Sequence, residues 1–212
     1  MMPLSVAVAI LFATWVGASP DVADEAKDSR AARAWTFGVT AFAFFLPDEP
    51  DYLQPTVSAD HGSLHLESRY AYEDRNTVSL FAGWNATMGK ALTLEVTPMV
   101  GVVAGRTDGI APGLELTLSW RLVELHSESE YVLAFGGAGS SFFYSWSELG
   151  LRPVHWLRAG LAVQRTRRFH SPREVSYGPM LGVTIGKLEA TFYVFDRGSA
   201  QRFAALSVSL SL

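Results

Sequence analysis

The sequence contains no cysteine, which excludes disulfide bonds, thiolate catalysis and zinc sites built on cysteine. A lipid anchor attached through a modified cysteine is excluded for the same reason. Lysine is also scarce, because only Lys27, Lys90 and Lys187 occur in the chain. The formal net charge is -4, so the chain lacks the basic surplus that nucleic-acid-binding proteins normally carry. We therefore expect no nucleic-acid partner.

Long apolar runs are absent, except for LSVAVAILFATWV at residues 4–16. This run is shorter than the roughly 20 residues that a spanning helix needs, and the small residues Gly17 and Ala18 follow it. The pattern predicts a cleaved secretory signal over residues 1–18, with a transmembrane anchor as the alternative. Residues 19–34 are polar and rich in alanine and charge, which predicts a flexible periplasmic leader or a short helix.

What the sequence does contain is alternation of apolar and polar residues with period two, from Trp35 to Leu212. In ALSVSLSL, at the carboxy terminus, leucine and valine alternate strictly with serine. Such alternation is typical of strands that expose two different faces. It predicts an all-β chain of about twelve antiparallel strands, with ten or fourteen as alternatives. The expected strands span residues 35–45, 52–60, 63–73, 76–86, 92–104, 110–121, 122–135, 142–151, 156–166, 175–186, 188–196 and 202–212.

The connections between the expected strands alternate in length. DHG, MGK, RL, RPVH and GK are tight, whereas LPDEPD, RTDG, GGAGSS, RRFHSPRE and RGSAQ are longer and more polar. An even strand number with short turns at one rim and longer loops at the other is the layout of a bacterial outer-membrane barrel. Both chain ends would then lie on the periplasmic side.

Alternation alone does not show whether the apolar face contacts lipid or lies in a protein core. A soluble sandwich or barrel would bury the leucine and valine face in its core. Two observations favour the membrane barrel. Soluble sheets commonly cover strand surfaces with lysine, which is scarce here. Aromatic residues such as Tyr52, Trp84, Trp120, Tyr131 and Trp156 fall near the expected strand ends, where a membrane barrel carries its interfacial girdles. Tyr72 is assigned to the same girdle.

An export signal, about twelve alternating strands and a chain that stops within its last strand resemble the outer-membrane β-barrel proteins of Gram-negative bacteria. The resemblance covers residues 35–212 at the level of architecture. In that group the last strand usually ends on an aromatic residue, whereas this chain ends on Leu212. The resemblance implies a location in the outer membrane and contact with its lipid and lipopolysaccharide.

The polar face of the expected barrel carries more carboxylates than guanidinium groups, and an acidic lumen favours cations over anions. We therefore predict a narrow porin-like channel for small hydrophilic solutes or ions, with preference for cations. A non-conducting structural barrel is the alternative, because long side chains can close a lumen of this size by pairing across it. The residues predicted to line the lumen are Glu67, Arg69, Glu95, Glu115, Arg121, Glu124, His126, Glu128, Glu130, Glu148, Arg158 and Glu189.

Catalytic and metal sites are less well supported by the sequence. A His-x-Ser spacing on a strand would place both side chains on one face, but His126 is followed directly by Ser127. The chain is therefore not predicted to be an enzyme, and a hydrolase acting on lipid or peptide remains the third alternative. No cofactor or metal is predicted, because one histidine among carboxylates is a weak signal. His65, Glu67 and Glu115 could contribute to a metal site only if the barrel brings them close.

Four arginines, Arg165, Arg167, Arg168 and Arg173, cluster in RTRRFHSPR at the expected outer rim. Guanidinium groups bind phosphates bidentately, which predicts contact with lipopolysaccharide phosphates, and an ordinary solvated loop is the alternative. Pro55, Pro98 and Pro179 fall on expected lipid-facing positions inside strands. Because proline cannot donate to a sheet ladder, each predicts a bulge or a strand that extends beyond its neighbour.

Overall fold

A computed structural model describes residues 34–47, 49–136, 141–168, 174–196 and 202–212. The export signal and leader expected over residues 1–34 lie outside the described part, apart from residue 34. The strands are β1 (Trp35–Phe45), β2 (Tyr52–His61), β3 (Leu64–Tyr70), β4 (Thr77–Trp84), β5 (Ala86–Gly89), β6 (Leu92–Gly105), β7 (Gly109–Trp120), β8 (Val123–Ala134), β9 (Phe142–Val154), β10 (Leu157–Arg168), β11 (Glu174–Ile185), β12 (Leu188–Asp196) and β13 (Arg202–Ser211). No helix in the described ranges is long and apolar enough to cross a membrane.

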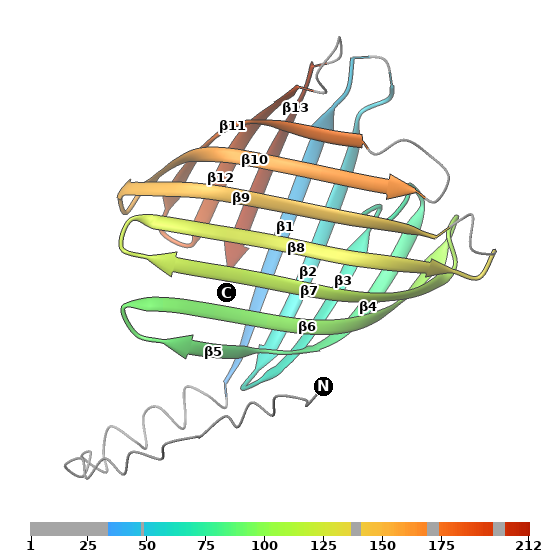
Figure 1. Ribbon diagram of the computed structural model, residues 1–212, viewed down its shortest axis with the longest axis horizontal. Helices are drawn as coiled ribbons and strands as arrows, with labels where there is room; N and C mark the ends of the chain where they lie inside the picture. The colour runs from blue at the N-terminus through green and yellow to red at the C-terminus, as the bar shows by residue number, and fades with distance from the viewer. Residues whose placement is uncertain (1–33, 48, 137–140, 169–173, 197–201) are drawn as a thin grey trace, which may run out of the picture. The chain divides into compact units, whose positions relative to one another are not determined.

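The strands form one closed antiparallel sheet (Figure 1). Apart from β4 and β5, each strand pairs with the next along the chain, and β1 pairs with β13, from Gly38↔Ser211 to Phe45↔Ala204. β4 and β5 both pair with β6, so they occupy a single strand position interrupted at Asn85. The barrel therefore has twelve strand positions, which confirms the predicted fold class and strand number.

The two rims of the barrel differ in the length of their connections. At the rim that carries the start of β1 and the end of β13, called here the short-turn rim, each of the five connections is two residues long. Gly62 and Gly186 supply the positive φ angles, 60° and 62°, that two of these tight turns require. The opposite rim, called the loop rim, carries the longer connections, as predicted.

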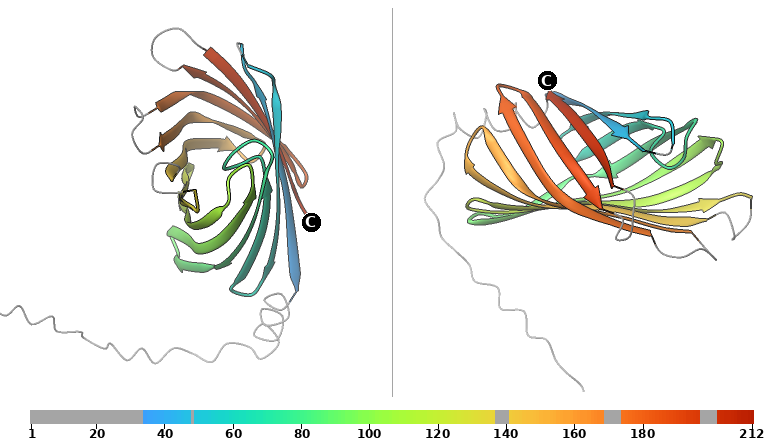
Figure 2. Two further views of the ribbon diagram at one scale, coloured as in Figure 1. Left: turned by 90° about the vertical axis from the view of Figure 1, so that its right-hand side faces the viewer. Right: turned by 90° about the horizontal axis from the view of Figure 1, so that it is seen from above.

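The outer face of the barrel is apolar. Large aliphatic side chains there are more than half exposed, among them Leu53, Leu80, Val102, Leu161 and Leu181. The inward positions of the same strands alternate with them and carry glutamate, arginine, threonine and serine. Two further views at right angles show the sheet curving round on itself (Figure 2). The apolar face is therefore the outside, as the membrane-barrel prediction requires.

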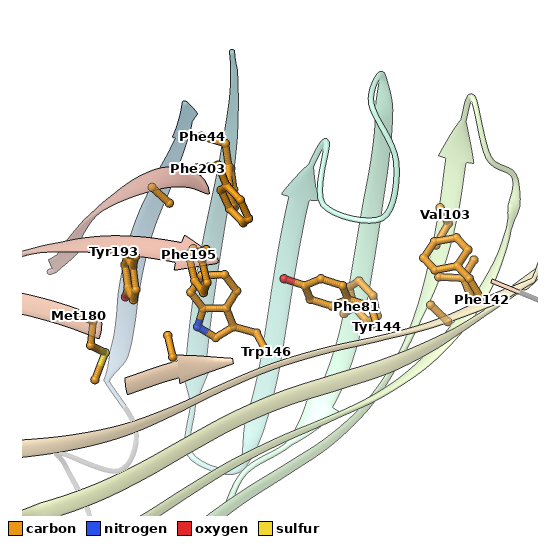
Figure 3. Packing of buried hydrophobic residues seen from close by; sticks show 14 of the residues in the cluster. Phe44, Phe81, Val103, Phe142, Tyr144, Trp146, Met180, Tyr193, Phe195 and Phe203 are labelled. Atoms are coloured by element: carbon orange, nitrogen blue, oxygen red, sulfur yellow. The ribbon is translucent and has the colours of Figure 1, made fainter. Parts of the chain in front are cut away.

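Aromatic side chains fill part of the interior, which the sequence pattern did not predict. Phe44, Tyr144, Trp146, Phe195 and Phe203 are each at most 7% exposed. Trp146 and Phe195 lie close together, and Phe44 lies beside Phe203 above them (Figure 3). The interior of this barrel is thus packed over part of its length by rings rather than lined only by charged groups.

The three strand prolines occupy positions where one neighbouring strand does not pair. The β2–β3 register begins at Thr56↔Arg69, immediately after Pro55. Pro98 lies between the last pair of β4 with β6 and the first pair of β5 with β6. Pro179 falls in the interval between Tyr177↔Asp196 and Met180↔Tyr193. Each missing amide donor therefore coincides with a break in the ladder, as expected of strand prolines.

Candidate functional site

Arg69 of β3 lies in the interior among carboxylates from three strands. Its guanidinium pairs with Glu67 of the same strand, with Glu115 of β7 at 3.1 Å and with Glu130 of β8 at 3.3 Å. The guanidinium carbon also lies 4.2 Å from the ring centroid of Tyr72. Because β3 and β8 are not neighbours in the sheet, these ion pairs cross the interior.

Glu128 of β8 connects the Arg69 group to a histidine. Tyr72 donates a hydrogen bond of 2.5 Å to Glu128 Oε2, and His126 Nε2 lies 3.2 Å from Glu128 Oε1. The other ring nitrogen of His126 lies 3.0 Å from Thr117 Oγ1. Burial raises the pKa of Tyr72, which lies in the β3–β4 loop, well above its ordinary value, so its hydroxyl remains a donor.

Thr117, His126 and Glu128 follow one another along a chain of hydrogen bonds, in the order that a nucleophile, its base and an orienting acid would have. The cavity at the short-turn rim, described below, is lined by Glu128 but by neither Thr117 nor His126. A substrate in this cavity would therefore not meet the hydroxyl of Thr117. The three side chains form a hydrogen-bonded chain in the wall of the barrel.

A second charged group surrounds Arg158 of β10. Arg158 pairs with Glu148 of β9 at 2.5 Å and with Glu124 of β8 at 3.0 Å. Arg152 lies 3.7 Å from Glu124 and 2.9 Å from Glu189 of β12, so it joins the two sides of this group. Glu148 also accepts hydrogen bonds of 2.7 Å from the Trp146 indole and the Tyr193 hydroxyl.

A cavity of about 550 Å³ occupies the interior at the short-turn rim. Its position follows from its lining, which includes Thr36 at the start of β1 and Gly62 in the β2–β3 turn. Five carboxylates and one guanidinium border it, namely Asp60, Glu67, Glu95, Glu115, Glu128 and Arg69. Hydroxyl-bearing residues such as Thr40, Ser58 and Thr97 complete a polar wall.

His65 of β3 also borders this cavity. Its Nδ1 lies 2.7 Å from Asp60 Oδ1, and its Nε2 is buried without a hydrogen-bond partner among the described atoms. One donor atom from each of His65, Glu67 and Glu115 lies within 4.8 Å of the others. Among the described residues, this is the group with the composition and closeness of a metal site.

Towards the loop rim, aromatic rings meet across the interior. Phe42 of β1 lies 5.3 Å from Trp146 of β9, measured between ring centroids, in an edge-to-face arrangement. Tyr72 and Tyr144 meet in the same way at 5.2 Å. Since β1 and β9 lie on opposite sides of the barrel, these contacts narrow the passage between the cavity and the loop rim.

The structure places most of the predicted lumen residues in these groups. The cavity takes Glu67, Arg69, Glu95, Glu115 and Glu128, and the ion pairs and hydrogen bonds described above involve Glu124, His126, Glu130, Glu148, Arg158 and Glu189. Arg121 is different, because β7 ends at Trp120, one residue before the end of the expected strand. Arg121 lies exposed in the β7–β8 turn with φ of 53°, and its guanidinium lies 5.2 Å from the Trp120 ring centroid.

Two other expectations need correction or lie beyond the described residues. Tyr72 was assigned to the outer girdle, but β3 ends at Tyr70 and Ala71 adopts φ of 55°, so Tyr72 turns inward onto Arg69. In the expected arginine loop, Arg165 lies within β10 with its guanidinium carbon 5.5 Å from the Phe143 ring centroid. Arg167 and Arg168 end β10, but their side chains are not described, and Arg173 lies outside the described residues.

Sequence reasoning missed Arg152, Asp60 and Asn85. Arg152 was assigned to a turn, yet β9 continues to Val154, and Arg152 keeps the alternation of Glu148 and Gly150. Continuing that alternation by one step would have found it. Asp60 lies at the end of β2 and Asn85 between β4 and β5, so only the folded sheet reveals their 2.6 Å hydrogen bond.

Comparisons with known proteins identify the fold. No protein-family profile matches the sequence, and no curated protein sequence matches it. Among solved structures, a KdgM porin aligns with a TM-score of 0.62 and 9% identity, covering 82% of this chain and 99% of that one. A KdgM porin in complex with disordered oligogalacturonate aligns with a TM-score of 0.60 and 11% identity, with the same coverage. The outer membrane protein OpdK from Pseudomonas aeruginosa aligns at 0.46 with 12% identity, over 80% and 61% of the two chains. The two KdgM alignments show that the chain has a porin fold.

Proposed function

We propose that this protein is a narrow channel of the bacterial outer membrane that passes small hydrophilic cations. The observation that carries the proposal is the composition of the cavity at the short-turn rim. Five carboxylates border it against the single guanidinium of Arg69. Carboxylate surplus in a confined space attracts cations and repels anions, because low-dielectric walls focus the field.

The size of the passage supports small solutes rather than large ones. Ion pairs from Arg69 to Glu115 and Glu130 cross the interior, and the Phe42–Trp146 contact crosses it nearer the loop rim. A barrel of twelve strand positions lies between small barrels with filled interiors and wide porins with open channels. Ions and small polar molecules fit this range.

The proposed solutes differ in charge from the ligand of the similar structure. One KdgM porin was solved with oligogalacturonate, a sugar polymer that carries carboxylates. Asp60, Glu95 and Glu128 at the cavity of this chain would repel such a ligand. We therefore propose that this barrel shares the porin architecture but has the opposite charge preference.

A planar bilayer experiment tests the proposal. Purified barrel in a salt gradient should give discrete conductance steps with a reversal potential that indicates cation selectivity. Glu95→Gln removes a cavity carboxylate that forms none of the ion pairs described above, so it should reduce the cation selectivity. Glu49→Gln is the control, because Glu49 lies in the β1–β2 loop with an exposed side chain. Anion selectivity of the wild-type channel would contradict the proposal.

A non-conducting structural barrel is the second candidate, and the Phe42–Trp146 contact is the observation that favours it. If these rings stay in contact, the interior is closed towards the loop rim. A bilayer that stays silent at every voltage, with protein shown to be folded, would support this candidate over the channel.

The proposal also includes the export of the chain and its contacts with lipopolysaccharide. An export signal over residues 1–18 and a leader over residues 19–34 would bring the chain to the periplasm, with the short-turn rim facing that side. Amino-terminal sequencing of the protein from outer membranes should begin near residue 19. The arginines from Arg165 to Arg173 would contact lipopolysaccharide phosphates at the loop rim.

A further inference from the structure

His65 has one nitrogen paired and one nitrogen without a partner, although its side chain is only 7% exposed. Buried polar atoms are normally hydrogen-bonded, so an orphaned imidazole nitrogen calls for a physical explanation. The unpaired Nε2 lies 3.9 Å from Glu67 Oε2, a distance too long for a direct hydrogen bond. The nitrogen therefore borders a space into which the Glu67 carboxylate also extends.

The paired nitrogen is held by a network that fixes the orientation of the ring. Asp60 Oδ1 lies 2.7 Å from His65 Nδ1 and accepts a second hydrogen bond of 2.6 Å from Asn85. Asn85 in turn accepts a hydrogen bond of 2.7 Å from Thr97. A carboxylate on Nδ1 keeps the proton there and leaves the lone pair on Nε2, as in the carboxylate–histidine pairs that support metal sites.

We propose that His65, Glu67 and Glu115 bind a divalent transition-metal ion such as Zn²⁺ in the cavity at the short-turn rim. Their donor atoms lie within 4.8 Å of one another. In a tetrahedral zinc site with bond lengths of about 2.1 Å, neighbouring donor atoms lie about 3.4 Å apart, so a contraction of at most about 1.4 Å between donors completes the site. Three protein ligands leave a position open to water on the cavity side.

The charge around the three ligands also favours a cation. Arg69 pairs with one oxygen of Glu67 and one of Glu115, and each carboxylate retains its second oxygen. Glu130 also pairs with Arg69, so three carboxylates share one guanidinium. Buried carboxylates without full compensation are costly, and a divalent ion supplies the missing positive charge.

The ligand types decide which ions fit. Imidazole suits zinc and its first-row neighbours, whereas Ca²⁺ and Mg²⁺ prefer sites made entirely of oxygen. The inference does not depend on conduction, because ion binding is measured on the folded barrel in detergent. A barrel that binds zinc but carries no current would uphold the site and contradict the channel, and the reverse result would do the opposite.

Isothermal titration calorimetry with zinc chloride tests the site on the full mature chain, folded in detergent and treated first with a chelator. We expect one Zn²⁺ per barrel, and no comparable heat with magnesium chloride. His65→Ala and Glu67→Gln each remove a ligand and should abolish binding in the measurable range. Asp60→Asn removes only the supporting carboxylate and should weaken binding by about 10- to 100-fold.

His126→Ala is the matched control, because His126 also lies in the interior but has both ring nitrogens within hydrogen-bonding distance of a partner. It should bind zinc as the wild type does. Heat-modifiable migration on gels confirms that each variant is folded before titration. Absence of zinc binding in the wild type, or unchanged binding in folded His65→Ala, would overturn the proposal, as would equal loss in His126→Ala.

Discussion

Arg69 is the residue on which the charged interior depends most directly. Its guanidinium pairs with Glu67, Glu115 and Glu130 together, and its side chain is 2% exposed. Desolvating a charge of this kind is costly, and only close partners offset the cost. The aromatic rings of Tyr72 and Phe81 cover the guanidinium, with centroids 4.2 and 4.7 Å from its carbon.

Arg69→Met should destabilise the barrel by about 3–5 kcal/mol, because it leaves buried carboxylates without their partner. The free energy of unfolding in urea, with the barrel in detergent micelles, measures the effect. Arg106→Met is the control, since its side chain is 65% exposed and pairs with Asp74 at 3.5 Å. An exposed pair is worth at most about 1 kcal/mol, so equal losses in the two variants would refute the role assigned to Arg69.

At the residue scale, the sequence predicted which side chains face inward but not which of them meet. Period-two alternation places Glu124, His126, Glu128 and Glu130 on one face of β8, and these side chains do point into the interior network. Besides partners on the adjacent strands β7 and β9, they have partners from β3, β10 and the β3–β4 loop. Pairing across a barrel depends on strand tilt and closure, which no local pattern encodes.

Strand β8 presents a second feature at the scale of the element: serines on its lipid-facing side. Ser127 and Ser129 interrupt an otherwise apolar outer face, as an error of one residue in the register would also do. The register holds, because Ser127 lies directly opposite Ser147 of β9 and their hydroxyl oxygens are 2.9 Å apart. The two hydroxyls satisfy each other beside the lipid.

A double-mutant cycle tests this pairing. Ser127→Ala alone leaves the Ser147 hydroxyl unpaired in an apolar setting and should cost about 1–3 kcal/mol of unfolding free energy. Ser127→Ala combined with Ser147→Ala removes both partners and should be close to neutral. Unfolding in urea of the wild type, both single variants and the double variant gives the coupling. Additive losses would instead assign these serines to contacts with another molecule.

The strands themselves were predictable because two features of the sequence mark them. Apolar and polar residues alternate within each strand, and clusters of turn-forming residues separate one strand from the next. Strands β1 and β12 have the predicted bounds. The main differences lie near Tyr70, where β3 stops early, and at Asn85, which separates β4 from β5. Both differences depend on the partner strand. For β3, the pairing with β2 stops at Thr56↔Arg69, next to Pro55, and β3 ends one residue later.

At the scale of the whole molecule, the interior is divided along its length. A polar cavity bordered by five carboxylates lies at the short-turn rim, and rings from β1, β9, β12 and β13 gather towards the loop rim (Figure 3). The alternation that revealed the barrel could not reveal this division. Phe142, Tyr144 and Trp146 occupy inward positions, whereas Ser145 and Ser147 occupy outward ones, so the apolar–polar alternation is reversed in this part of β9.

Trp146 is the ring that contacts both sides of the interior, because it meets Phe42 of β1 at 5.3 Å and Phe195 of β12 at 5.2 Å. If the passage is narrowed here, Trp146→Ala should raise the single-channel conductance and leave the cation preference unchanged, since the carboxylates stay in place. The measurement is a planar bilayer recording under the conditions used for the wild type.

Trp156→Ala provides the comparison, because Trp156 lies 47% exposed in the β9–β10 turn, away from the ring cluster. Its conductance should match that of the wild type. Loss of a buried tryptophan also costs about 3–5 kcal/mol, so heat-modifiable migration must show that Trp146→Ala is folded. A folded Trp146→Ala barrel with unchanged conductance would place the constriction elsewhere, at the Arg69 ion pairs that cross the interior beside the cavity.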